Sequence, residues 1–154
     1  QYEKTDPKLT NASGGNALLH YSDWILEFQP RWSRDMIPPK EKKPDGHWCR
    51  VIFRKSANER TGTEVRYPIK YGRTGGRSIW TEYEIIDMLL QWDMATTKGA
   101  WIMVGDTLLE ELKKEGLEME SKHQGLDNFR KYLEEMHKVR DYLFNKFKRA
   151  LEIK

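Results

Sequence analysis

The chain has 154 residues, enough for one average domain or two small ones. Hydrophobic residues make up 38% and aromatic residues 12% of it, which is typical of a folded protein and excludes a disordered tail. No apolar run approaches the roughly 18 residues that a membrane-spanning helix needs. A single cysteine, Cys49, excludes a disulfide framework and a cysteine-rich zinc site, and predicts a soluble protein of a reducing compartment. Because residue 1 is Gln rather than Met, we expect a piece of a longer protein.

The formal charge of +3 is distributed unevenly along the chain. Residues 30–75 carry 12 basic and 5 acidic side chains, whereas residues 76–125 carry 5 basic and 10 acidic ones. The basic segment favours contact with a polyanion, because lysines and arginines that neutralise phosphates release counterions. The alternative is an ordinary solvated surface of mixed charge.

The first half of the chain is predicted to be mainly β. Residues 1–16 are polar and rich in turn residues, so we expect a loop there, followed by a short helix at 16–22. Alternating apolar side chains predict strands at residues 24–28, 47–55 and 65–71. A turn at 61–63 should join the last two strands as an antiparallel hairpin, with Pro68 facing a sheet edge or a bulge. Prolines and lysines predict an exposed loop over 34–46.

Helical spacing begins after a glycine-rich break at 72–76, which predicts a domain boundary near residue 76. Thr81 and Glu84 have the spacing of a capping box, and the helix that they start is expected to end at Lys98-Gly99. The remaining predicted elements are a short buried strand at 100–104, a helix at 106–115 and a long amphipathic helix from Leu126 onward.

The residue pattern shows no self-contained active site. Gly72–Ser78 lies between a strand and a helix, as a phosphate-binding loop would. Its glycines are four rather than five positions apart, however, and Arg77 replaces the required lysine, so a plain turn is favoured. The four histidines are scattered, and the paired glutamates stand beside lysines on predicted helices, so neither a metal site nor an acid–base pair is predicted.

Two basic or glycine-bearing segments remain as candidates for binding anions. The glycines of residues 10–16 leave backbone amides unobstructed at a helix start, where they either contact phosphates or simply cap the helix. Arg54 and Lys55 end a strand together, so at least one of them should project from a sheet edge. That side chain either reaches a phosphate on another molecule or protects the edge from pairing.

Four segments, in register over residues 10 to about 145, resemble the C-terminal part of RecA-type recombinases. The first, Gly14-Gly15-Asn16-Ala17-Leu18, resembles the end of the second DNA-binding loop of that family. The others are Val51-Ile52-Phe53-Arg54-Lys55, then Ile69-Lys70-Tyr71-Gly72 with Glu84-Ile85-Ile86-Asp87, and finally Lys98-Gly99-Ala100-Trp101 with Gln124-Gly125, Asn128 and Lys131-Tyr132-Leu133. The divergence is similar to that of bacteriophage relatives of the UvsX-like kind.

The resemblance implies an α/β fold. Residues 1–76 would be the last strands of a P-loop ATPase core, and residues 77–154 a small C-terminal α/β domain that ends in a long helix. It also implies a function in recombination and repair: filaments on single-stranded DNA, ATP and Mg bound between protomers, and strand exchange with a homologous duplex. The expected partners are single-stranded and duplex DNA and further copies of the chain, in the cytoplasm of a bacterial host.

The resemblance also implies roles for residues at matching positions. The DNA backbone would be contacted by Thr10, Asn11, Ala12, Ser13, Gly14, Gly15 and Asn16. The second DNA would be contacted by Arg31, Arg34 and Arg50, and the ATP phosphates of a neighbouring protomer by Arg54, Lys55 and Ser56. His20 falls where the family often has an aromatic residue that couples the two sites.

The chain also departs from the family pattern. Leu19 and Ser56 stand at or near positions where the family has lysines, and residues 106–121 look like an insertion. The phosphate loop, the catalytic glutamate and the first DNA loop would lie upstream of residue 1, so the chain should not hydrolyse ATP by itself. The alternative is a noncatalytic nucleic-acid-binding or assembly module with a RecA-derived fold. A Gly-x-x-x-x-Gly-Lys-Ser/Thr segment in the upstream reading frame would favour the recombinase.

Overall fold

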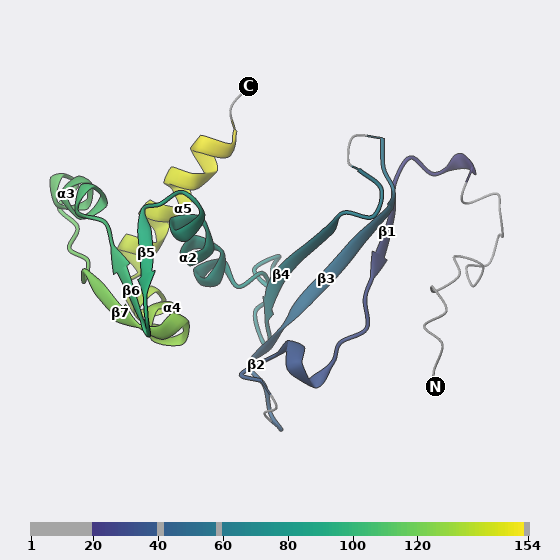
Figure 1. Ribbon diagram of the computed structural model, residues 1–154, viewed down its shortest axis with the longest axis horizontal. Helices are drawn as coiled ribbons and strands as arrows, with labels where there is room; N and C mark the ends of the chain where they lie inside the picture. Colours follow the sequence, from purple (N-terminus) through teal and green to yellow (C-terminus); the bar gives the residue numbers. More distant parts are fainter. Residues whose placement is uncertain (1–19, 40–41, 58–59, 153–154) are drawn as a thin grey trace. The chain divides into compact units, whose positions relative to one another are not determined.

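The structure, a computed structural model, describes residues 20–39, 42–57 and 60–152 (Figure 1). It has a mixed α/β architecture with two antiparallel sheets, as the sequence predicts at this coarse level. The chain divides into two compact units, Gln1–Arg66 and Tyr67–Lys154. The division falls inside a strand, β4 (Glu64–Lys70), whereas we expected a boundary near residue 76. None of the helices in the described part of the chain is long and apolar enough to cross a membrane.

The first unit is built around the long strand β3 (Gly46–Lys55). The shorter strands β1 (Ile25–Phe28) and β2 (Met36–Ile37) pair with β3 in antiparallel fashion, and β4 also pairs with it. The predicted turn is present: Gly62 has φ of 90°, a left-handed conformation that glycine adopts without steric cost, and its N–H donates to the Phe53 carbonyl at 2.8 Å. The predicted strands of this half are therefore confirmed.

The predicted exposed loop over 34–46 is only partly correct. A 3-10 turn, η2 (Ser33–Asp35), and β2 lie at its start, where Asp35 and Ile37 are buried. The Asp35 carboxylate accepts the Trp32 backbone N–H at 2.9 Å and so closes the turn, while Ile37 pairs with Gly46 of β3. The segment was predicted as a loop because its residues are mostly polar. The 3-10 turn and β2 have only three and two residues, too few to show a helical or strand period in the sequence.

The second unit combines a three-stranded antiparallel sheet with four helices. The strand order is β5-β6-β7, with β6 in the middle. The strands are β5 (Ala95–Lys98), β6 (Trp101–Val104) and β7 (Lys122–Gln124). The helices are α2 (Thr81–Gln91), α3 (Asp106–Lys114), α4 (Gly125–Glu135) and α5 (His137–Leu151).

Three predictions for this half are wrong. The first helix ends at Gln91 rather than near Lys98, because residues 95–98 pair with β6 as strand β5. Thr81 is the first residue of α2 and its hydroxyl donates to the Ile79 carbonyl at 3.4 Å, so no capping box forms. The long C-terminal helix is two helices, α4 and α5, separated at Met136. Strand β6 and helix α3 were predicted correctly. The strand was expected to be buried, however, and the side chain of Trp101 is exposed.

Pro68 in β4 is placed as expected for a residue that cannot donate a ladder bond. Its carbonyl accepts the Trp80 N–H at 2.8 Å, and the Lys70 N–H donates to the Ser78 carbonyl at 2.7 Å. These two bonds make up an isolated bridge between Ile69 and Ile79 rather than a ladder between named strands. The proline nitrogen therefore faces the weakly paired side of the strand.

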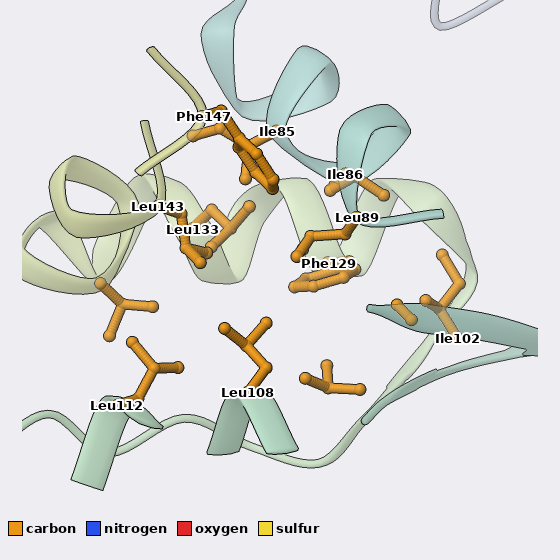
Figure 2. Packing of buried hydrophobic residues seen from close by; sticks show 13 residues of the cluster. Ile85, Ile86, Leu89, Ile102, Leu108, Leu112, Phe129, Leu133, Leu143 and Phe147 are labelled. Carbon is orange, nitrogen blue, oxygen red and sulfur yellow. The ribbon is translucent and has the colours of Figure 1, made fainter. Parts of the chain in front are cut away.

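The core of the second unit lies between one face of the sheet and the four helices (Figure 2). Phe129 of α4 is at its centre, with no exposed surface, among side chains from both the sheet and the helices. The fully or nearly buried members are Ile85, Ile86, Leu89, Ala95, Ile102, Val104, Leu108, Leu112, Phe129, Leu133, Val139, Leu143 and Phe147.

A network of charged side chains around the buried Glu82 holds the glycine-rich turn at 72–76 against α2 and α4. Glu82, only 1% exposed, accepts two hydrogen bonds from Arg73 at 3.2 Å each and one from Arg140 at 3.4 Å. Glu134 of α4 is paired with Lys70 and accepts one hydrogen bond from the Trp80 indole N–H at 2.9 Å. Burial alone would raise the pKa of Glu134, but the hydrogen bonds from its cationic neighbours and the indole outweigh burial and lower that pKa.

His123 of β7 is a buried neutral histidine beneath α4. Its ring stacks on Phe129 with centroids 4.0 Å apart, and its Nε2 lies 3.1 Å from the Glu120 carbonyl. Burial lowers the pKa of His123 below the value of a free imidazole, although the contacts with Glu120 partly oppose this. The folded protein therefore resists protonation at this site more than the unfolded chain does.

We expect acid to destabilise the second unit through His123. As the pH falls below about 6.5, the unfolded chain binds a proton that the folded state excludes, so the melting temperature should drop. The His123→Gln variant should show a flatter dependence of melting temperature on pH between 7 and 5.5 than the unmodified chain. Parallel curves for the two proteins would show that another group causes the acid sensitivity.

Candidate nucleic-acid interface

Three arginines of the first unit meet at one surface cavity of about 280 Å³. The cavity is lined by Arg34 and Asp35 of η2, Arg50 of β3 and Arg66 of β4, and we call it the arginine cavity. Asp35 is buried, whereas Arg34 and Arg66 are exposed and Arg50 is partly exposed. The lining therefore presents three guanidinium groups beside one buried carboxylate.

Strand alternation places two of these arginines on the same face of the sheet. Side chains two residues apart on a strand point to the same side, so Trp48 and Arg50 share one face of β3. Contacts from β4 reach that face: the Arg66 guanidinium lies 5.6 Å from the Trp48 ring centroid, and the Glu64 carboxylate lies 3.9 Å from an Arg50 nitrogen. The hairpin thus brings Arg50 and Arg66 together, although they are far apart in the sequence.

The arginine cavity has hydrogen-bond donors to spare. Arg50 lies 3.9 Å from the Glu64 carboxylate, too far for a strong hydrogen bond to that group. Within the same described residues, Arg34 forms no ion pair. Because Arg presents a planar set of N–H donors that matches phosphate oxygens, this arrangement is suited to binding a phosphate group.

The third arginine that the resemblance assigned to DNA lies close by. Arg31 does not line the arginine cavity, but its charge acts on His47 of β3. Burial is the main reason that the pKa of His47 is lowered; Arg31 lowers it further and Asp35 raises it. The region around the start of β3 is therefore positively charged.

The residues expected to contact ATP lie at the other end of β3. Arg54 is paired with Glu27 of β1, and this hydrogen bond is the main cause of the lowered pKa of Glu27. The Lys55 ammonium donates to the His20 carbonyl at 3.3 Å, which brings the predicted coupling residue next to a predicted nucleotide contact. Ser56 follows at the end of the strand and is partly buried.

The remaining predicted site residues, 10–16, lie outside the described residues. In the part of the chain that the structure describes, no group of three or more His, Cys, Asp or Glu side chains could hold a metal ion.

Arg66 is a site residue that sequence reasoning missed. It alternates with Val65 and Tyr67, so its position on the polar face of β4 was visible in the pattern. Arg66 lies close to Arg50 only because of the register in which β3 and β4 pair, and the sequences of the two strands do not specify that register.

No protein-family model matches the chain, and no curated protein sequence matches it either.

Proposed function

We propose that the chain is part of a RecA-type recombinase and that the arginine cavity contacts the DNA backbone. The observation that carries this proposal is the convergence of Arg34 and Arg50. The resemblance assigned both to DNA although they are separated by 16 positions, and they line one cavity together with Arg66. The antiparallel pairing of β2 with β3 brings the two arginines together, and the cavity that they share supports a common ligand.

An exposed apolar face of the first unit also supports a larger ATPase core. Leu26 and Phe28 of β1 alternate with Trp24 just before it, and 45%, 62% and 43% of their surfaces are exposed, respectively. Large apolar side chains in a contiguous row are rarely left in water unless another surface covers them. Further strands of a core would cover this row.

Nucleotide binding by this chain alone is not part of the proposal. Arg54 would have to leave Glu27 to reach a phosphate on a neighbouring protomer, and the described residues offer no group that fits Mg. In the proposed recombinase, ATP and Mg would be held mainly by residues other than the described ones.

The proposal predicts salt-sensitive DNA binding that depends on the exposed arginines. The Arg34→Gln/Arg66→Gln double variant removes two guanidinium groups but leaves the partly buried Arg50 in place. Its affinity for a labelled single-stranded oligonucleotide should fall at low salt, and the slope of log affinity against log salt should decrease by about 1.4, or roughly 0.7 per lost phosphate contact. Fluorescence anisotropy over a range of salt concentrations measures both quantities.

The matched control is the Lys113→Gln/Arg149→Gln double variant, which removes the same charge from exposed positions on α3 and α5. Equal losses in the two variants would mean that net charge rather than the arginine cavity determines binding, and the proposal would fail. Loss in the cavity variant alone would support it.

A further inference from the structure

The three-stranded sheet of the second unit has one face that the helices do not cover. Ile102 and Val104 of β6 are buried in the core, so the alternate residues Trp101 and Met103 point to the opposite side. Trp101 is 40% exposed there. An exposed indole on a sheet face presents a planar aromatic surface on which another ring can stack.

The register of the sheet defines the neighbours of Trp101 on this face. Lys98 of β5 and Gln124 of β7 lie directly across from Trp101, and Thr96 and Lys122 lie across from Met103. We call the six residues the open sheet face: Thr96, Lys98, Trp101, Met103, Lys122 and Gln124. All of them except the half-buried Met103 are exposed.

The open sheet face is positively charged although the unit that carries it is neutral. Residues 67–154 contain 15 basic and 15 acidic side chains, whereas the six residues of the face include two lysines and no carboxylate. The Lys122 Nζ lies 5.6 Å from the centroid of the Trp101 ring. The two lysines stand on the strands that flank β6 and are offset by two residues along it, so their backbones are about 12 Å apart.

We propose that the open sheet face binds single-stranded nucleic acid, with a base stacked on Trp101 and phosphates paired with Lys98 and Lys122. A nucleotide strand offers a planar ring and a phosphate in each repeating unit, which matches an indole between two lysines. An acidic peptide would satisfy the lysines but would leave the indole unpartnered. A duplex holds its bases inside the stack, where Trp101 cannot reach them without unpairing.

The test follows the indole N–H signal of Trp101 by NMR in the whole chain. The Trp101→Phe variant identifies the signal, because the Trp101 signal is the one of the six tryptophan signals that this variant lacks. Titration with a 12-residue oligothymidylate should shift that signal and saturate. The Trp101→Phe variant should keep its affinity, since phenylalanine still stacks, whereas Trp101→Leu should bind at least about fivefold more weakly although it keeps an apolar side chain.

An abasic oligonucleotide of equal length separates stacking from charge. It should bind more weakly and shift the Trp101 signal less, because its phosphates still reach Lys122 beside the ring; an equal shift would overturn the proposal. A duplex or a hexaglutamate peptide that shifts this signal as strongly as the single strand would also overturn it. If Trp101→Leu fails to fold, as judged by its other indole signals, the comparison of the two oligonucleotides on the unmodified chain still decides.

Discussion

Replacing Glu82 with alanine is expected to destabilise the second unit by about 3 kcal/mol, in the range measured when one partner of a buried ion pair is removed. Glu82 is almost completely buried and holds both Arg73 and Arg140. Its loss leaves a cavity and two guanidinium groups that have lost a shared acceptor. The effect should lie near the lower end of that range, because both arginines are about one quarter exposed, at 26% and 27%, and can be partly rehydrated.

Urea unfolding followed by circular dichroism measures this change. The matched control is Glu110→Ala on the exposed surface of α3, which should change the free energy of unfolding by less than about 0.5 kcal/mol. Adding Arg73→Ala to the Glu82→Ala variant should cost less than Arg73→Ala costs in the unmodified chain, because the pair is already broken. Equal destabilisation by Glu82→Ala and Glu110→Ala would contradict the proposed role of the network.

The network also explains why part of this fold was predictable from local sequence and part was not. The glycine-rich break at 72–76 was visible, and so was the helix after it. The salt bridges from Arg73 to Glu82 and Glu134 join residues 9 and 61 positions apart. Helix and strand periods in the sequence relate only residues two to four positions apart, so they could not predict these pairs. In the sequence, Glu134 stands beside Glu135 and Lys131 and so resembles an ordinary solvated helix face.

The same distinction separates the strands that were predicted from those that were missed, β2, β5 and β7. Strands β3 and β4 alternate over 10 and 7 residues, which is long enough for a period of two to be recognised. Strand β5 has only four residues, Ala-Thr-Thr-Lys, and its partner β6 supplies the pairing that makes it a strand. Tertiary pairing thus overrode the helical pattern that precedes it.

At the candidate interface, the sequence resemblance identified Arg34 and Arg50 but not Arg66. Arg34 and Arg50 could be identified because each is a basic residue at a position that matches the family pattern. The third requires knowledge of which β4 residue lies beside Arg50, and a shift of one position would have turned Arg66 to the other face of the sheet.

Replacing Phe129 with alanine should cost about 3–5 kcal/mol, the largest effect that we expect from a single substitution in the second unit. Phe129 has no exposed surface and lies among Leu89, Ile86 and Leu133 (Figure 2). It also stacks on His123, so its removal takes away an aromatic contact and leaves the imidazole beside a cavity. Neighbours from a sheet and from several helices cannot all move inward to fill that space.

Phe144 provides a matched control because it is the same residue type on α5 of the same unit and is 45% exposed. Its replacement by alanine should change the free energy of unfolding by less than about 0.5 kcal/mol. Phe129→Leu, which keeps most of the buried volume, should fall between the two and remains measurable if Phe129→Ala does not fold. If the Phe129 and Phe144 variants unfold at the same urea concentration, the core does not centre on Phe129, because burial is the property in which these two side chains differ most.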